Sequence, residues 1–487
     1  MFSKRNLRSF CEALLLVLCS STFVFASAES GHGDLGNQLP LWSCIPFLGM
    51  LLSIAIFPLL KPEWWEHNML KVAIFWALVF LIPFGVVFGA QMLTFQVLEM
   101  ILLDYLPFIV LLFGLFVAAG GIALKGTLVG NTKTNVVLLL IGTAIASWVG
   151  TTGAAMLMIR PIIRANAWRE KKAHVIIFFI FMVANIGGCL TPVGDPPLFL
   201  GFLRGVPFFW TMKLFPIMLF NIIILTVIFI LLDKNLCKKE LAAGRSPQKM
   251  NGNSVKTPLR IEGAHNFIFI FMIVGAVILN GMLPNFASFA DQATGELYGL
   301  HIAGVLFPYN SIIQMLIILA AAFLSMVTTK KEIRQANSFT FAPIEEVAKL
   351  FIGIFLTMIP ALAILKANGA SLGITEPWQF FWATGALSSF LDNAPTYLVF
   401  LTTAGSVGFT EGVATTVGIV AARDLLAISA GAVFMGANTY IGNAPNFMVK
   451  SIAEENKIKM PSFFGYMAWS LGILIPIFIL DTLLFFR

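Results

Sequence analysis

Two aspartates are the residues of this chain best placed to bind and release an ion within a membrane. Asp195 and Asp392 each lie at an interruption of a long apolar stretch. A charge at the bilayer centre costs about 2.5–3.5 kcal/mol on insertion scales, so an acid at such a position suggests a functional site. The alternative is that each aspartate only caps a half-helix by accepting backbone N–H bonds. Four other acids lie nearer to the ends of apolar stretches, where we expect water or headgroups to solvate them: Asp104, Asp233, Asp424 and Asp481.

Neutral oxygen donors surround both aspartates in the sequence. Small alkali cations such as Na⁺ and Li⁺ prefer oxygen ligands, which broken helices supply in transporters. The hydroxyl groups have a simpler alternative role, because Ser and Thr often bond to a carbonyl of the preceding turn. The predicted metal ligands for Na⁺ are Asp195 and Asp392, and the predicted supporting ligands are Thr151, Thr152, Thr191, Ser388, Ser389, Asn393, Thr439, Asn443 and Asn446.

A proton can neutralise the same carboxylates as a cation. If the two aspartates approached to about 4 Å, an effective dielectric constant near 20 would give roughly 4 kcal/mol of repulsion, which either species would relieve. Competition between Na⁺ and H⁺ is sufficient for antiport, provided that the site faces one side at a time. None of the five histidines lies deep in an apolar run. We therefore expect a carboxylate to carry the proton.

The composition predicts a polytopic membrane protein. Of 487 residues, 58% are apolar and 11% are charged, and the mean hydropathy is +0.89. Soluble chains carry roughly 25% charged residues. These values exclude a water-soluble enzyme, a disordered scaffold and a nucleic-acid-binding domain. The net charge of +7 fits basic loops on the cytoplasmic side. The chain has no nucleotide fingerprint, so neither an ATP-driven pump nor a cofactor is expected.

Charge and leader patterns predict the orientation. Residues 1–28 resemble a cleaved signal peptide, with a basic start, an apolar stretch and Ala-Ser-Ala at 26–28. A retained first helix is the alternative for this segment. If the mature chain begins outside, most Lys and Arg residues fall on the cytoplasmic side, as the positive-inside rule requires. The alternation of sides along the chain is consistent only if segments 134–163 and 377–404 each enter and leave the membrane on the same side. We therefore predict a multi-pass protein of a bacterial-type inner membrane, in contact with lipid and without a nucleic-acid partner.

The interrupted stretches also predict an inverted repeat. Thr191–Phe199 aligns without gaps on Thr439–Phe447 at an offset of 248, with Thr, Gly, Pro and Phe shared. Inverted repeats with broken helices are typical of secondary transporters. The predicted fold is all-α, with two five-element halves that each hold a re-entrant hairpin and a broken helix. The predicted helix-breaking residues are Gly194, Pro196, Pro197, Pro395, Gly442 and Pro445.

These patterns set the predicted domain boundaries. The first transmembrane half is 29–232, with its repeat at 69–232, its hairpin at 134–163 and its broken helix at 174–203. The second half is 266–487, with the repeat at 310–486, the hairpin at 377–404 and the broken helix at 425–450. A basic cytoplasmic linker, 233–265, joins the halves.

Two of these segments resemble the ion transporter superfamily, and within it the NhaD-type sodium/proton antiporters. Gly187–Asp195 is similar to that family's Gly-Gly-x-x-Ser-Pro-Ile-Gly-Asp element, and Ser388–Pro395 to its Ser-Ala-x-x-Asp-Asn-x-Pro element. The resemblance implies electrogenic exchange of Na⁺ or Li⁺ for H⁺, with Asp195 and Asp392 as the ion-binding acids. It also implies a homodimer with elevator-like motion.

One feature departs from the antiporter pattern, and another resembles anion carriers of the same superfamily. Pro196 and Pro197 stand where the antiporters usually have Thr, and Ile441–Asn446 is similar to a segment of arsenite permeases and dicarboxylate carriers. A related branch comprises citrate transporters. Helix N-termini at the breaks could hold a substrate carboxylate, with Na⁺ or H⁺ offsetting the repulsion from the aspartates. A cation-coupled citrate or dicarboxylate carrier is therefore the alternative. An intramembrane aspartyl protease also uses two membrane aspartates, but it requires no internal repeat.

Overall fold

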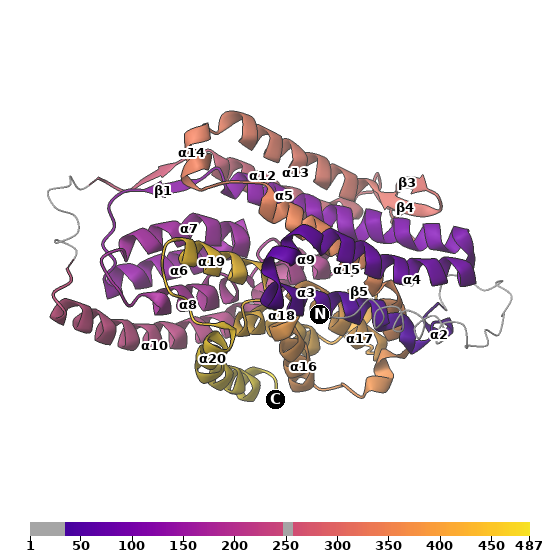
Figure 1. The fold of residues 1–487 in the computed structure, drawn as a ribbon. Coiled ribbons are helices and arrows are strands. Elements are labelled where there is room, and N and C mark those ends of the chain that lie inside the picture. The colour runs from indigo at the N-terminus through magenta and orange to yellow at the C-terminus, as the bar shows by residue number, and fades with distance from the viewer. Residues whose placement is uncertain (1–34, 247–256) are drawn as a thin grey trace.

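The first part of the chain folds into helices of very different lengths (Figure 1). The computed structural model describes residues 35–246 and 257–487, so the predicted signal peptide lies outside the described residues. The elements up to the linker are α2 (Leu35–Gln38), η1 (Leu41–Cys44), α3 (Ile45–Leu60), α4 (Pro62–Glu99), η2 (Met100–Tyr105), α5 (Leu106–Ala119), β1 (Ala123–Lys125), α6 (Thr132–Val149), α7 (Thr151–Ala165), α8 (Ala173–Met182), η3 (Ile186–Gly188), α9 (Pro196–Leu203), η4 (Phe208–Leu214) and α10 (Phe215–Ala242).

The second part contains a similar mixture of long and short helices. Its elements are β2 (Arg260–Glu262), α12 (Asn266–Met282), η5 (Leu283–Asn285), β3 (Gly299–Ile302), β4 (Val305–Pro308), α13 (Tyr309–Thr328), α14 (Lys331–Ala336), α15 (Ala342–Asn368), η6 (Gly369–Leu372), α16 (Pro377–Phe390), α17 (Asn393–Ser406), β5 (Val413–Thr415), β6 (Gly418–Val420), α18 (Ala422–Met435), η7 (Gly436–Asn438), α19 (Ala444–Glu455) and α20 (Phe463–Phe485).

Within the described residues, eight helical segments are long and apolar enough to cross a membrane. Each exceeds the length of about 17 residues that a span requires. This confirms the prediction of an all-α, multi-pass membrane protein. The segment Pro62–Ala119 contains a break at Gly89, whose φ of 83° no continuous helix adopts. The other segments are Leu41–Pro58, Thr132–Val149, Phe208–Ala242, Asn266–Asn285, Tyr309–Thr328, Ala342–Leu372 and Phe463–Phe485.

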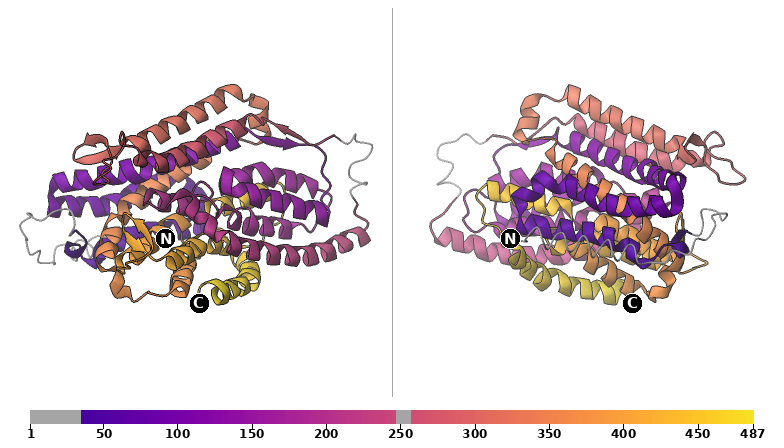
Figure 2. Two further views of the ribbon diagram at one scale, coloured as in Figure 1. Left: turned by 180° about the vertical axis from the view of Figure 1, so that it is seen from behind. Right: turned by 45° about the vertical axis from the view of Figure 1, so that its right-hand side comes forward.

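The short helices α8 and α18 lie inside the protein, packed against other helices. Helices α5, α12 and α13 pack together along one long edge of the molecule, as Figures 1 and 2 show. Every residue of α8 after Ala173 is buried, and α18 is buried along most of its length. Helices that are apolar all round belong in such an interior. Irregular backbone at membrane depth is tolerated only where protein covers it, so this arrangement permits the breaks that follow α8 and α18.

In the part of the chain that the structure describes, six short strands form three antiparallel pairs, which the sequence analysis did not predict. Strand β1 pairs with β2 and thereby ties the segment before α6 to the segment before α12. Strands β3 and β4 form a hairpin whose turn residues Ala303 and Gly304 both have positive φ, as a two-residue hairpin turn requires. The third pair joins β5 to β6. None of these strands lies within a candidate span.

Candidate functional site

Four half-helices begin at the carboxylate of Asp195. Its Oδ1 accepts hydrogen bonds from the Thr151 hydroxyl at 2.9 Å and from Asn443 Nδ2 at 3.1 Å, and its Oδ2 accepts one from Asn393 Nδ2 at 2.8 Å. Thr151 and Asn393 are the first residues of α7 and α17, whereas Asp195 and Asn443 immediately precede α9 and α19. All four side chains are buried. Helix N-termini carry partial positive charge, so this arrangement favours a negative group at the centre.

Glycine and proline residues create the turns that bring these helix ends together. Gly150 ends α6 with a φ of 83° and lets the chain reverse into α7. The backbone N–H of Thr151 then donates to the Gly194 carbonyl at 2.8 Å, which fastens this hairpin to the break after α8. Pro196 and Pro197 begin α9, where a missing N–H costs nothing.

The two helix breaks share a close glycine contact at aligned positions. A Cβ added to Gly194 would lie 2.1 Å from the Gly188 carbonyl oxygen, and one added to Gly442 would lie 2.5 Å from that of Gly436. Both approaches are too close for a real Cβ, so each break requires glycine. The two pairs of glycines differ by the offset of 248 found in the sequence.

The hairpins also contact the breaks through equivalent bonds. The Thr191 hydroxyl donates to the Ser147 carbonyl, and the Thr439 hydroxyl donates to the Ser389 carbonyl. Ser147 Oγ donates to the Gly187 carbonyl at 2.6 Å, which further fastens the first hairpin to its break. The two halves thus share local contacts at the aligned residues Thr191 and Thr439, whose serine partners lie 44 and 50 residues before them. Their inverted relation in the membrane stays a prediction.

The side chain of Asp392 caps a helix, whereas the side chain of Asp195 does not. It precedes α17 and accepts a hydrogen bond from the backbone N–H of Ala394 at 3.0 Å, as a helix cap does. Asp195 makes no such cap bond to α9. Asp392 is partly exposed and lies within electrostatic range of Asp195, but within the described residues no hydrogen bond joins the carboxylates. Asn393, the neighbour of Asp392, is the residue that contacts Asp195.

Several other predicted ligands bond to backbone carbonyls rather than to the aspartates. Ser388 donates to the Ala432 carbonyl at 2.7 Å, and Ser389 donates to the Gly385 carbonyl one turn earlier at 2.7 Å. Thr152 follows Thr151 in α7 and is partly buried. Pro395 lies in the first turn of α17, and Pro445 in the first turn of α19. The alternative role given to the hydroxyl groups, a bond to the preceding turn, therefore describes Ser389, whereas Ser388 bonds to a carbonyl of α18.

Asn185 is a buried residue of this site that the sequence analysis missed. It lies between α8 and η3, accepts a bond from Asn443 at 3.3 Å and donates to Asn446 Oδ1 at 2.7 Å. Asn446 in turn donates to the Thr439 carbonyl at 2.9 Å. Asn185 therefore links the break of the first half to that of the second. Its position as a lone amide within an apolar stretch was the available signal.

The expectation that solvent reaches the four remaining acids is wrong, because all four are buried. Asp104 pairs with Arg204 at 2.8 Å. Asp481 accepts from Asn221 at 2.9 Å to each of its oxygens. Because these acids lie far from their partners in the sequence, no local pattern could reveal the pairs. Asp424 is the fourth buried acid.

Asp233 lies in a buried ionic cluster. Its Oδ1 accepts from Arg169 at 2.5 Å and contacts His174 at 2.8 Å, and its Oδ2 accepts from Thr132 at 2.6 Å. His174 is thus a buried histidine at the start of an apolar helix, although the sequence placed no histidine deep in such a run. The cluster joins α6, α8 and α10, so it holds the first hairpin beside the first broken helix.

The fold and the site together define a class of protein. Multiple membrane-spanning helices around two interrupted helices, with a carboxylate at one interruption, are features of a membrane transporter rather than of an enzyme. Among residues 35–246 and 257–487, no group of three or more His, Cys, Asp or Glu side chains could hold a metal ion. Any cation at Asp195 would therefore rely mainly on neutral oxygen ligands.

Residues 36–486 match the sequence profile of a family described as "Putative citrate transport". The match covers nearly the whole chain, so the protein belongs to this family of the ion transporter superfamily. No match was found among curated proteins. The family assignment confirms the predicted superfamily and a transport role. The NhaD-type exchange of Na⁺ for H⁺ stays a prediction.

Proposed function

We propose that the protein is a secondary active transporter in which Na⁺ or Li⁺ competes with H⁺ for Asp195. The observation that carries this proposal is a buried carboxylate with three neutral hydrogen-bond donors. Among residues 35–246 and 257–487, no Lys, Arg or His bonds to it. A buried carboxylate without a compensating charge is costly. A small cation or a proton removes that cost, and the two cannot occupy the carboxylate together.

Neutral oxygen atoms next to Asp195 support binding of a small cation. Asn393 Oδ1 is buried and has no hydrogen-bond partner among the residues that the structure describes, although the Nδ2 of the same side chain donates to Asp195. An unsatisfied buried carbonyl oxygen costs about 1–3 kcal/mol, which a cation at that oxygen would recover. In this proposal Asp195 and Asn393 provide the first ligands, with the Thr151 hydroxyl oxygen beside them, and the charge of Asp392 adds to the attraction.

Alternating access would convert this competition into exchange of the cation for a proton across the membrane. In the proposed cycle the hairpins α6–α7 and α16–α17 move with the broken helices, so that Asp195 faces one side of the membrane and then the other. The inverted repeat, the re-entrant path of both hairpins and a homodimer with elevator-like motion belong to this proposal, as does a location in a bacterial-type inner membrane.

A cation-coupled carrier of citrate or another small carboxylate is the second candidate function. The description of the family favours it, and so do the four helix N-termini at Asp195, because such termini attract anions. When a cation or proton neutralises Asp195, the partial positive charge of these termini becomes available to a substrate carboxylate. Coupling would then arise because the anion binds only after the cation.

Everted membrane vesicles with an imposed pH gradient distinguish the two functions. For antiport, we expect NaCl or LiCl to dissipate the gradient, whereas choline chloride should have no effect. Carriage of an anion would instead require citrate, and uptake of labelled citrate would depend on Na⁺ or H⁺. A gradient that NaCl and LiCl leave unchanged in vesicles containing the folded protein would refute the antiport proposal.

A further inference from the structure

Helix α10 is longer than the hydrocarbon layer that it would cross. Its 28 residues, Phe215–Ala242, extend about 42 Å at 1.5 Å per residue, against about 30 Å of hydrocarbon. The apolar part ends at Leu232, and the last turns carry the exposed residues Lys234 and Lys238. The end of α10 that bears these lysines therefore projects into the headgroup region of one membrane surface.

The two lysines continue the face of α10 that contacts lipid. Leu219, Ile223, Val227 and Leu231 recur every four residues and are 44%, 54%, 53% and 67% exposed, as side chains in contact with acyl chains would be. Residues three or four apart lie on one face of a helix. Lys234 is three residues beyond Leu231, and Lys238 is four residues beyond Lys234. Both ammonium groups therefore lie where the lipid-facing stripe meets the phosphate groups.

The acids near these lysines are already paired elsewhere. Asp233 and Glu240 are seven residues apart, so they share a face, and that face is turned toward α8 and the loop before it. Asp233 bonds to Arg169 and His174. Glu240 accepts the backbone N–H of Lys171 at 2.9 Å and pairs with Arg245 at 3.1 Å. Neither acid is available to neutralise Lys234 or Lys238.

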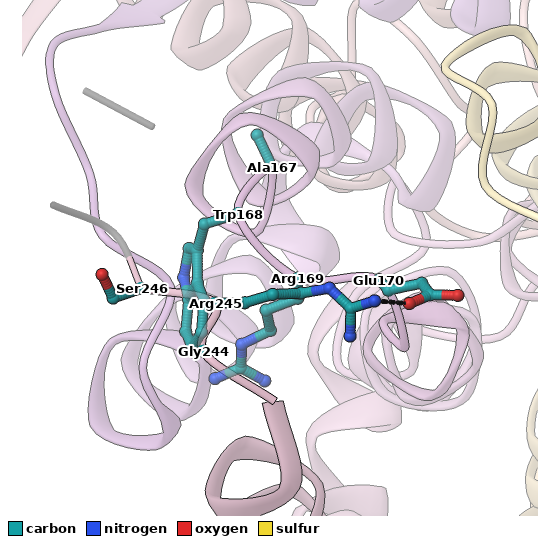
Figure 3. A pocket seen from close by; sticks show the side chains of 7 residues that line it. All are labelled: Ala167, Trp168, Arg169, Glu170, Gly244, Arg245 and Ser246. Carbon is teal, nitrogen blue, oxygen red and sulfur yellow. Dashed lines mark hydrogen bonds and ion pairs between the residues drawn. The ribbon is translucent and has the colours of Figure 1, made fainter. Parts of the chain in front are cut away.

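A pocket beside this end of α10 also contains cationic side chains, but acidic side chains already neutralise them. It has a volume of about 510 Å³, and its two arginines are both engaged by acids. Figure 3 shows Arg245 directed at Glu170, with which it forms an ion pair. Arg169 is paired with Asp233. Lys234 and Lys238, on the lipid-facing side of α10, form no ion pair within the described residues. The pocket is lined by Ala167, Trp168, Arg169, Glu170, Gly244, Arg245 and Ser246.

We propose that Lys234 and Lys238 form a binding site for the phosphate groups of anionic phospholipids in the surrounding bilayer. The site combines an apolar stripe for the acyl chains with two unpaired ammonium groups at headgroup level. Each lysine at an anionic membrane surface strengthens the interaction by about five-fold, so the pair should provide about 25-fold.

Native mass spectrometry of the detergent-solubilised full-length protein tests this site. Phosphatidylglycerol is titrated against phosphatidylcholine with matched acyl chains, and inorganic phosphate is added in a third arm. We expect preferential binding of phosphatidylglycerol, lowered roughly 25-fold in the Lys234→Gln/Lys238→Gln variant. The matched control is Lys457→Gln/Lys459→Gln, which removes the same charge from exposed positions that follow no lipid-facing stripe.

The control variant should keep the lipid preference of the wild-type protein. Size-exclusion chromatography establishes that both variants remain folded, which is expected because the two α10 side chains make no ion pair or hydrogen bond within the described residues. The proposal is overturned if the two lipids bind equally to the wild-type protein or if both variants lose the preference alike. Displacement of phosphatidylglycerol by an equal concentration of inorganic phosphate would instead indicate a site for a soluble anion, which also overturns it.

Discussion

Replacing Asp195 by asparagine removes the charge of the proposed ion site and nearly preserves its shape. A cation about 4 Å from a carboxylate gains roughly 4 kcal/mol at an effective dielectric constant near 20. Each 1.4 kcal/mol is a factor of ten in affinity, so Asp195→Asn should weaken cation binding about a thousand-fold. The new amide would also place a donor opposite Asn393 or Asn443, which both donate to this position. We expect this mismatch to cost about 1–3 kcal/mol of stability.

The assay is cation-dependent dissipation of a pH gradient in everted vesicles, with the half-maximal Na⁺ or Li⁺ concentration as the readout. In the wild-type protein, a higher proton concentration should raise that value, because protons and cations compete. The variant should show no dissipation at cation concentrations that saturate the wild type. Expression and melting temperature are measured in parallel, so that lost transport can be separated from lost folding.

Asp481→Asn is the matched control. Asp481 is also a buried carboxylate in a candidate span, but its partner is Asn221 rather than a residue of the helix breaks. We expect this variant to keep the cation dependence of the wild type. If Asp195→Asn exchanged ions at wild-type concentrations, the proposed role of Asp195 would be wrong. An equal loss of cation-dependent exchange in both variants would also contradict the proposal, since it would show that a carboxylate at the helix break has no special role.

Three further changes test the surroundings of the site. Thr151→Val removes one of the three donors to Asp195; because bonds to a charged group contribute about 1.5–3 kcal/mol, we expect the half-maximal cation concentration to rise at least ten-fold in the same vesicle assay. Gly194→Ala would place a Cβ 2.1 Å from a carbonyl oxygen of the same break, so we expect lost transport and a lower melting temperature, and unchanged behaviour would contradict the close contact. Arg169→Met should leave the buried charge of Asp233 unpaired and destabilise the protein by about 3–5 kcal/mol, whereas the double variant Arg169→Met/Asp233→Leu should recover much of that loss in a thermal melt.

The sequence determined the features of this protein that depend on local composition. Apolar runs of sufficient length predict spans, because hydrocarbon excludes unsatisfied polar groups wherever the run occurs. Glycine and proline predict interruptions, because their backbone restrictions act at their own positions. For this reason a hairpin within 134–163 and the start of α9 at Pro196 were predictable, and so was the presence of Asp195 at a break.

Only the tertiary structure decided how the polar side chains are partnered. The sequence treated Asp195 and Asp392 alike, yet one receives three side-chain bonds and the other caps a helix. The donors to Asp195 come from 44, 198 and 248 residues away. These donors reach Asp195 because the hairpins pack against the helix breaks. The hydropathy of the individual segments does not determine this packing. The same reason explains why Asn185 was missed and why Asp233 was expected to be solvated: burial and pairing are properties of the packed helices and not of any one segment.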